Sequence, residues 1–456
     1  MKPVLDYLKQ NNQRFIDDLC EYLRFPSVSA QSKHQQDMTA CAQWLVRRCR
    51  GLGLETKLHP TAGHPIVVAK TRRQKGSKKP AFLVYGHYDV QPPEPFELWK
   101  SPPFEPRIVG RSVFARGSVD NKGQHLAHLN AVEAYLKTGT ELPCDLTFLV
   151  EGEEEVGSKS LGGFLKQHAK ELACDAVVIS DNGIPSLTLP ALTYALRGIM
   201  AVEIVVHGPS RDLHSGLFGG SVDNPAMALC QLLAKLRDKD GRIAIPGFYD
   251  DVAALSAFER KQLARLPHDD RAYAKFLGVP SLFGEKGFTA TERRSARPTV
   301  EINGLTSGYQ DEGSKTIIPS WARAKLTFRL VPDQKPDRIR RLVLKQLKQL
   351  CPSTVRLEIK SGHGGEPYLV SPTGPHAQAS MRALQRAFNR EPILMREGGS
   401  IPIVNQFKKH LAADTLLLGL SLPDDNPHSP NEKMSLDCYE KGMRMGAWLW
   451  QELAKV

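Results

Sequence analysis

Short apolar runs alternate with amphipathic helical patterns through roughly the first 190 residues. The runs AFLVY (81–85), LTFLV (146–150) and AVVIS (176–180) are continuously apolar, as strands covered on both faces of a sheet are. Between the first two, QHLAHLNAVEAYLKTG places Leu126 and Leu129 at helical spacing. This alternation predicts an α/β fold with a mostly parallel sheet covered by helices.

The pattern changes near Arg197. The segments IMAVEIVVHG, RPTVEING and AKLTFRLV alternate apolar and polar residues, as half-exposed strands do, and helical stretches such as NPAMALCQLLAKLRD separate them. The first pattern then returns with a helix at AQASMRALQRAFN, a strand at DTLLLGL and a closing helix at YEKGMRMGAWLWQEL. We therefore expect one α/β domain formed by residues 1–196 and 367–456, and an inserted α+β domain over residues 197–366.

Length and cysteine usage are consistent with this organisation. A chain of 456 residues is long enough for two domains. No apolar run reaches membrane-spanning length, and the N-terminal segment lacks the apolar core of a signal peptide. The eight cysteines are scattered without a Cys-x-x-Cys pair, which is typical of reduced thiols. We expect a cytoplasmic protein that does not enter a membrane.

The net charge of +12 raises the alternative of a nucleic-acid-binding protein. The densest basic stretch, TRRQKGSKK at 71–79, contains no aromatic residue on which a base could stack. No helix-turn-helix, zinc-finger or RNA-recognition signature is present. A solvated loop explains the basic stretch better, and we expect no nucleic-acid partner.

Polar side chains follow the ends of the predicted strands, and in an open parallel sheet ligands bind beyond those ends. Each has an ordinary structural explanation alone: a hydrogen-bonded histidine, a helix cap or a solvated acidic turn. Their coincidence at one sheet edge favours a metal site instead. Two histidines and several carboxylates without cysteine suit Zn²⁺ or Mn²⁺, and are oxygen-rich enough for two metals that share a carboxylate. The residues at this edge are His87, Asp89, Asp120, the acidic cluster 151–155, Asp181 and His428.

Nine motifs resemble those of the dimetal amidohydrolase family, which includes carnosine dipeptidases, glutamate carboxypeptidase, aminoacylase and succinyl-diaminopimelate desuccinylase. They occur in the family's order and span essentially the whole chain. Together, GSKTIIP, REGGSIP and HSPNEK most resemble the branch of cytosolic non-specific dipeptidases and carnosinases. The nine motifs are GHYDVQP, RGSVDNKG, EGEEEVGS, SDN, DLHSG, GSKTIIP, RLVP, EGGSIP and HSPNEK.

The resemblance implies two divalent metal ions per chain, zinc with manganese as the alternative. The ligands that the resemblance implies are His87 and Asp181 for one metal and Glu155 and His428 for the other. Asp120 is implied as the ligand that bridges both metals. In the family a cis peptide bond follows the bridging aspartate, so we expect one between Asp120 and Asn121.

The resemblance also assigns roles around the metals. Glu154 is implied as the general base that faces the metal-bridging water. Asp89 is implied as the carboxylate that fixes the tautomer of the His87 imidazole. Glu151 and Glu153 match no functional position of the family, and we interpret them as structural or solvated.

The inserted domain is implied to act as a lid and dimerisation domain of the catalytic domain. His214 in DLHSG matches a histidine that stabilises the oxyanion in the active site of the partner subunit. Arg329 in RLVP matches the clamp for the substrate's carboxylate, which its planar fork suits. Thr316 and Ser400 match further substrate contacts. The resemblance therefore implies a homodimer formed through the inserted domains.

The function implied is hydrolysis of the amide bond of small peptides. We expect a metal-dependent dipeptidase that acts on dipeptides with a free C-terminal carboxylate. An N-acyl-amino-acid deacylase or desuccinylase of the same family remains an alternative, because it needs the same metals and the same clamp. A nucleic-acid-binding scaffold is the alternative from a different class.

Overall fold

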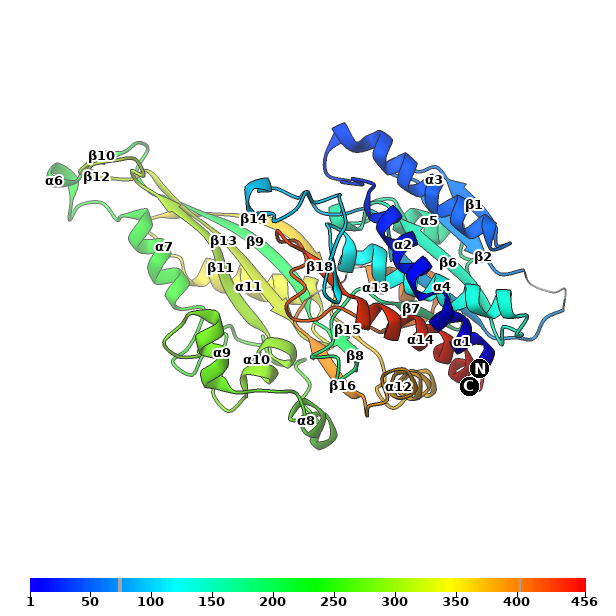
Figure 1. The fold of residues 1–456 in the computed structure, drawn as a ribbon. Coiled ribbons are helices and arrows are strands. Elements are labelled where there is room, and N and C mark those ends of the chain that lie inside the picture. Colours follow the sequence, from blue (N-terminus) through cyan, green and yellow to red (C-terminus); the bar gives the residue numbers. More distant parts are fainter. Residues whose placement is uncertain (73–75, 400, 402) are drawn as a thin grey trace. The chain divides into compact units, whose positions relative to one another are not determined.

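The structure is a computed structural model that describes residues 1–72, 76–399, 401 and 403–456 (Figure 1). Residues 73–75 of the basic stretch, and Ser400, lie outside the described residues. The chain divides into two compact units. The first comprises Met1–Tyr194, Val370–Met395 and Ile403–Val456, and the second comprises Ala195–Leu369 and Arg396–Pro402.

A nine-stranded mixed sheet contains the core of the first unit. Its order is β1-β2-β6-β3-β7-β17-β8-β15, and β16 pairs with β8. The four central strands β6, β3, β7 and β17 are parallel, while the strands on either side pair antiparallel. The strands are β1 (Glu55–His59), β2 (Ile66–Lys70), β3 (Ala81–His87), β6 (Asp145–Glu151), β7 (Ala176–Ile179), β8 (Ala191–Leu196), β15 (Tyr368–Leu369), β16 (Ile393–Glu397) and β17 (Asp414–Leu417). The predicted α/β class is confirmed, with the parallel strands confined to the centre.

Helices cover this sheet, as predicted (Figure 1). The most central is α4 (Gly123–Thr138), which contacts β3, α1 and α14 and has thirteen of its sixteen residues buried. The other helices are α1 (Lys2–Gln10), α2 (Asn12–Leu23), α3 (Gln35–Gly51), α5 (Leu161–Gln167), α12 (Pro375–Phe388), α13 (Ile403–Leu411) and α14 (Leu436–Leu453), with short helical turns at Ser32–His34 and Phe96–Leu98.

A small three-stranded sheet brings distant motifs together in the first unit. Its order is β18-β5-β4, formed by β4 (Arg107–Val109), β5 (Ser112–Phe114) and β18 (Lys433–Ser435). Strand β5 leads into the helical turn Ser118–Lys122 of the RGSVDNKG motif, and β18 directly follows the HSPNE segment. The pairing of β18 with β5 therefore places these two motifs side by side.

The second unit is built on a four-stranded antiparallel sheet of order β11-β13-β9-β14. The strands are β9 (Gly198–His207), β11 (Thr299–Ser307), β13 (Trp321–Leu330) and β14 (Arg356–Gly365). Buried residues of β9, β11 and β13 share one hydrophobic core with residues of α7 (Pro225–Ala234) and α11 (Pro336–Leu350), and partly buried residues of β14 pack against it. The α+β character and the alternating strands expected from the sequence are present. The remaining elements are β10 (Leu213–His214), α6 (Ser215–Phe218), α8 (Ala257–Leu263), α9 (Asp270–Leu277), α10 (Ala290–Ala296) and β12 (Ile317–Ile318).

The segment Arg396–Pro402, which begins with the last two residues of β16, belongs to the second unit, although it lies outside residues 197–366. The Arg396 guanidinium forms an ion pair with Glu259. The Arg197 Nε donates to the backbone oxygen of Gly398 over 3.1 Å. These contacts within the unit explain why the segment departs from the continuous insertion that the sequence predicts. Among the described helices, none has the length and apolar character needed to span a bilayer.

Candidate metal centre

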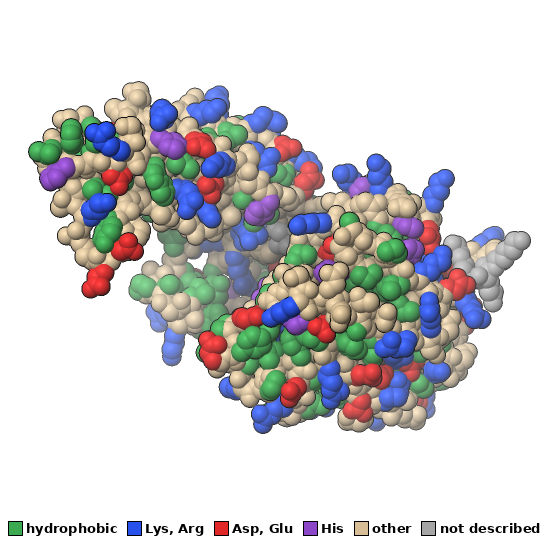
Figure 2. Space-filling model, turned by 90° about the horizontal axis from the view of Figure 1, so that it is seen from above, with side chains coloured by type: hydrophobic (Ala, Val, Ile, Leu, Met, Phe, Trp, Pro, Cys, Tyr) green, Lys and Arg blue, Asp and Glu red, His purple; other side chains and the backbone are tan. Residues whose placement is uncertain are grey.

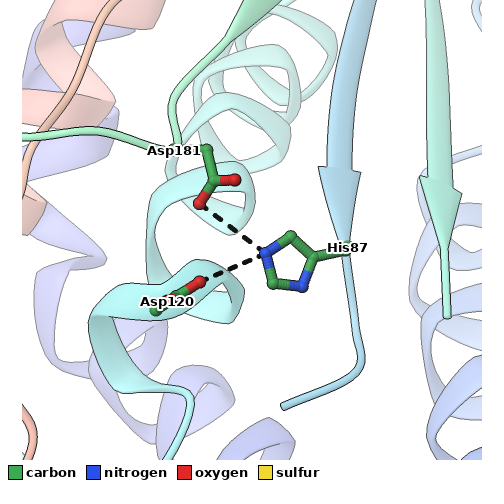
Figure 3. Close-up of side chains that lie close together, drawn as sticks. All are labelled: His87, Asp120 and Asp181. Carbon is green, nitrogen blue, oxygen red and sulfur yellow. Dashed lines mark ion pairs between the residues drawn. The ribbon is translucent and has the colours of Figure 1, made fainter. Parts of the chain in front are cut away.

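Two groups of metal-ligand-type side chains lie in the first unit and share Asp120. His87, Asp120 and Asp181 form one group, and Asp120, Glu155 and His428 form the other. Within each group the ligand atoms all lie within 4.8 Å of one another. Figure 3 shows the first group, with His87 at the end of β3 and both aspartates pointing toward its imidazole. All five ligands expected from the sequence are thus brought together.

The two oxygens of Asp120 face different groups. Its Oδ1 lies 3.2 Å from the Nε2 of His87, which is also 3.6 Å from the Oδ1 of Asp181. Its Oδ2 lies 2.9 Å from the Nε2 of His428, which is 3.4 Å from the Oε2 of Glu155. A carboxylate that offers one oxygen to each of two clusters has the arrangement of a bridging ligand.

Unpartnered polar atoms show that the site fits cations. The buried Nε2 of His87 and the buried Oε1 of Glu155 have no hydrogen-bond partner among the described residues. Such atoms cost free energy unless something binds them, and they are often explained by a missing ion. A divalent cation accepts electron pairs from both kinds of atom. The donor set of imidazole and carboxylate without thiolate is the one that zinc and manganese sites use.

The tautomer of His87 is set by the other ring nitrogen. Its Nδ1 lies 3.0 Å from the backbone oxygen of Asp89 and 3.4 Å from the Oδ1 of that residue. Because a carbonyl oxygen only accepts, Nδ1 carries the hydrogen and Nε2 keeps its lone pair for a metal. The sequence analysis expected the Asp89 carboxylate in this role, and its Oδ1 does face Nδ1, with the backbone carbonyl of the same residue nearer still.

The Asp89 carboxylate also holds the acidic turn. It accepts hydrogen bonds from the backbone nitrogens of Glu154 (3.3 Å) and Glu155 (3.1 Å), and from the Ser29 hydroxyl (2.7 Å). The residues Glu154–Val156 form a single helical turn. Asp89 therefore fixes the direction in which both glutamates leave the backbone.

Uncompensated negative charge dominates the electrostatics of the centre. Burial, and next the charge of Asp120, raise the pKa of Glu155 to about 9. Burial also raises the pKa of Asp181 and raises that of Glu154 well above the ordinary value, with nearby carboxylates adding to the shift. Burial opposes protonation of His87, but Asp181 and Asp120 together raise its pKa well above the ordinary value. The carboxylates of this site favour a positive partner, which bound cations would provide.

Glu154 differs from Glu155 in its contacts. The Oε2 of Glu155 accepts a hydrogen bond from the Gln91 side chain over 2.8 Å and faces His428. In the part of the chain that the structure describes, no side-chain hydrogen bond or ion pair holds the Glu154 carboxylate. Glu154 is nevertheless close enough to His87 and Asp181 for their charges to shift its pKa. It is therefore a carboxylate near the metal groups that remains available for proton transfer.

Two other acids of the cluster are structural. The buried Glu151 accepts hydrogen bonds from the Tyr85 hydroxyl (2.7 Å) and the Ser158 hydroxyl (2.8 Å). The buried Glu153 accepts one from the backbone nitrogen of Ser160 over 3.0 Å. Because both side chains are buried, Glu151 and Glu153 are structural and not solvated.

The bridging residue is held by a carboxylate that the sequence analysis missed. Glu432 has no exposed surface and accepts four hydrogen bonds. The donors are Arg116 Nη1 (2.8 Å), Gly117 N (2.9 Å), Val119 N (2.9 Å) and Asp120 N (3.1 Å). The available signal was its place in HSPNEK, four residues after a predicted ligand.

Asn121 connects the two halves of the first metal group. The peptide bond between Asp120 and Asn121 is cis, as the family resemblance implies. The Asn121 amide nitrogen donates to the Oδ1 of Asp181 over 2.9 Å. Its amide oxygen accepts from the backbone nitrogen of His87 over 3.3 Å.

Three of the four residues expected to contact substrate are described by the structure and lie in the second unit. His214 ends β10 with an exposed side chain, whose Nδ1 accepts from the backbone nitrogen of Gly216 over 3.0 Å. Thr316 directly precedes β12, the partner strand of β10. Arg329 is half-buried on β13. Ser400 lies outside the described residues.

The chain is similar in sequence to known dipeptidases over nearly its whole length. The Cys-Gly metallodipeptidase of Candida albicans is 32% identical over 98% of this chain and 96% of that protein. The Beta-Ala-His dipeptidase of Homo sapiens is 28% identical over 100% of this chain and 93% of that protein.

Solved structures show the same similarity. Human carnosine dipeptidase 1 superposes with a TM-score of 0.82 at 27% identity, covering 100% of this chain and 99% of that one. The metallo-carboxypeptidase Sso-CP2 from Sulfolobus solfataricus gives a TM-score of 0.85 at 31% identity, covering 97% of this chain and 99% of that one. The model of Peptidase family M20/M25/M40 matches residues 83–452, and the chain belongs to this family of peptidases.

Proposed function

We propose that this protein is a metal-dependent dipeptidase that hydrolyses the amide bond of dipeptides with a free C-terminal carboxylate. The observation that carries the proposal is the pair of ligand groups joined through Asp120. Relatives of nearly the same length, named as a Cys-Gly metallodipeptidase and a Beta-Ala-His dipeptidase, support it.

The five residues of the two groups are proposed to hold two divalent cations, zinc or alternatively manganese. Such cations, when bound, polarise a carbonyl and lower the pKa of bound water toward neutrality. The residues in this role are His87 and Asp181 for one cation, Glu155 and His428 for the other, and Asp120 for both.

Proton transfer is assigned to Glu154. Its carboxylate takes a proton from the attacking water and passes it to the nitrogen of the leaving amine. The absence of a competing side-chain partner among the described residues supports this role, as does its proximity to His87 and Asp181. Asp89 keeps Glu154 in place by accepting the hydrogen of its backbone nitrogen.

Substrate recognition is proposed for the second unit, acting as a lid and dimerisation domain. Arg329 would pair with the C-terminal carboxylate of the substrate, with Thr316 and Ser400 as further contacts. His214 would stabilise the oxyanion in the active site of a partner subunit. Exposed apolar side chains close to His214 support a homodimer through this unit, since Leu217 is 74% and Phe218 40% exposed.

The proposed location is the cytoplasm. All eight cysteines are free thiols, and the described structure contains no disulfide among them.

The test is turnover by the metal-reconstituted protein of a dipeptide panel alongside N-acetyl and N-succinyl amino acids. A dipeptidase cleaves Ala-Gly-type substrates and loses activity when their free amino group is acetylated. A deacylase shows the reverse order, and that outcome would replace the proposed substrate class.

A gel shift over a range of salt concentrations tests the nucleic-acid alternative. On the face shown in Figure 2, Lys and Arg side chains are scattered among acidic and neutral ones. That face gives no support to a continuous basic groove for nucleic acid.

A further inference from the structure

The second unit contains a cavity of about 490 Å³ whose lining is unusually rich in arginine. The cavity lies among α9, α10 and residues of strands β11 and β13. Six arginines and two glutamates face it. They are Arg197, Arg237, Arg293, Arg294, Arg297 and Arg329, with Glu285 and Glu301.

One of the two glutamates is already neutralised. The buried Glu285 accepts two hydrogen bonds of 2.7 Å from Arg297, one to each carboxylate oxygen. Such a bidentate pair uses both the charge and the geometry of the carboxylate. This leaves Glu301 as the other acid of the lining, facing five more arginines.

Three of these arginines, Arg237, Arg293 and Arg294, form no ion pair with an acidic side chain among the described residues. The Arg293 Nε donates to the backbone oxygen of Glu285 over 2.9 Å, and the Arg294 guanidinium lies 5.8 Å from the centre of the Tyr273 ring. Burial, and next the charge of Arg329, lower the pKa of Arg197 to about 10, and Arg294 contributes to this shift. Arg329 and Arg294 are therefore close enough to Arg197 for their charges to repel it, Glu301 offsets part of this effect, and an anion beside them would relieve the repulsion.

The same cavity has an apolar wall. Tyr273 and Leu277 from α9 line it together with Val279 and Phe283. Leu277, Val279 and Phe283 are 47%, 41% and 69% exposed, so apolar surface is open for contact with a ligand. Guanidinium groups beside apolar side chains suit a ligand with a short hydrocarbon stem and an acidic end.

We propose that this cavity selects dipeptides whose C-terminal residue has an acidic side chain, glutamate or aspartate, with Arg294 pairing with the side-chain carboxylate. The inference rests on the proposed function, in which Arg329 pairs with the C-terminal carboxylate of the substrate. Because Arg329 itself lines the cavity, the side chain of the residue that it holds lies next to the other arginines. One carboxylate would leave Arg294 uncompensated, whereas a second carboxylate on the same residue pairs with it.

The test compares Ala-Glu with Ala-Gln, which have the same shape and differ by one charge. For the metal-loaded wild type we expect kcat/KM for Ala-Glu to exceed that for Ala-Gln by about ten-fold, as a charge-assisted hydrogen bond provides. Arg294→Gln should abolish the preference while turnover of Ala-Gln persists. Arg294→Glu should reverse the sign of the selection and favour Ala-Lys.

The matched control is Arg271→Gln, which removes the same charge from an exposed position of α9 that is not part of the cavity lining. It should retain the ten-fold preference. An equal loss in Arg271→Gln would mean that the general field of the unit, and not the cavity, selects the substrate, and would overturn the proposal.

The remaining outcomes separate this inference from the proposed function. If the wild type cleaves Ala-Gln or Ala-Leu as well as Ala-Glu, the dipeptidase stands and the acidic selection is wrong. If no dipeptide is cleaved, the proposed function fails. Calorimetry with free L-glutamate and L-glutamine then tests, independently of catalysis, whether the cavity binds an acidic side chain. Binding of glutamate about ten-fold tighter, dependent on Arg294, would support it, and equal binding would overturn it.

Discussion

Glu432 accepts the backbone N–H of Asp120 over 3.1 Å, although 312 positions separate the two residues in the sequence. Together with the bonds from Gly117 and Val119, this contact holds the loop that presents Asp120 to both ligand groups. The charge of Arg116 at 2.8 Å makes the burial of Glu432 tolerable. The bridging ligand is thus positioned from the far end of the chain.

Glu432→Gln should therefore weaken metal binding without removing any ligand. The amide keeps one acceptor oxygen but presents N–H groups to backbone donors, so the loop loses part of its support. We expect metal affinity to fall by about 10–100-fold, as loss of such outer contacts typically gives. Titration of the metal-free protein with Zn²⁺ measures this directly.

The control for this variant is Glu452→Gln. Glu452 is another buried, ion-paired glutamate, with Arg382 at 2.7 Å, but it lies on α14. Its substitution should lower stability and leave metal affinity unchanged. Wild-type metal affinity in a folded Glu432→Gln protein would contradict the positioning role.

Glu154→Gln and Glu155→Gln should separate proton transfer from metal binding. Removal of a general base typically costs 10²–10⁴-fold in rate, so Glu154→Gln should lose kcat while retaining its metal. Glu155→Gln removes a ligand from the group that contains His428, and should lower metal content first. Near-normal kcat in metal-loaded Glu154→Gln would show that another group transfers the proton.

Metal content should approach two ions per chain after gentle purification. His428→Ala affects the second group alone, whereas Asp120→Asn affects both, so we expect the aspartate variant to lose more metal. Elemental analysis, with thermal unfolding before and after chelation, measures both effects. Ligand binding stabilises by about 2.7 kcal/mol at a hundred times the dissociation constant, so chelation should lower the Tm. Saturation of the wild type at one ion would rule out the bridged arrangement.

Much of this centre follows from the sequence because it depends on strand ends. His87 is the last residue of β3 and Asp181 is the second residue after β7, and these neighbouring parallel strands have their carboxyl ends at the same edge. Glu432 could not be found this way. Its role depends on the pairing of β18 with β5, and such short strands have no periodicity of their own.

The sequence pattern could not predict the antiparallel outer strands or the arginine cavity either. β2 is as continuously apolar as the parallel strands, so its pattern does not reveal its direction. Arg197, Arg294 and Arg329 are well separated in the sequence. Taken alone, each would be interpreted as an ordinary exposed arginine. Their proximity emerges only when the second unit folds.

Stability should fall in acid partly because His128 is buried. Burial lowers its pKa to about 4, and its Nε2 lies 2.8 Å from the Ser180 hydroxyl. The unfolded chain, with a histidine pKa of about 6.5, binds the proton that the folded chain excludes, so stability is lost as the pH falls below 6.5. Between pH 7.5 and pH 5 this contributes about 2 kcal/mol. Urea unfolding of wild type and His128→Gln at both pH values should show a smaller pH dependence in the variant, and an identical dependence would contradict this account.

The side chain of His214 is exposed and its neighbours Leu217 and Phe218 leave apolar surface uncovered, while every predicted metal ligand belongs to the first unit. If His214 acts in the active site of a partner, inactive Glu154→Gln and inactive His214→Ala proteins should complement each other after subunit exchange. One of the two sites in the mixed dimer then has both residues intact, so up to half of the sites regain activity. Mixing Glu154→Gln with His87→Ala is the control, because each site of that heterodimer keeps one defect and should stay inactive. Verified heterodimers of the first pair without activity would place His214 in the site of its own subunit or outside catalysis.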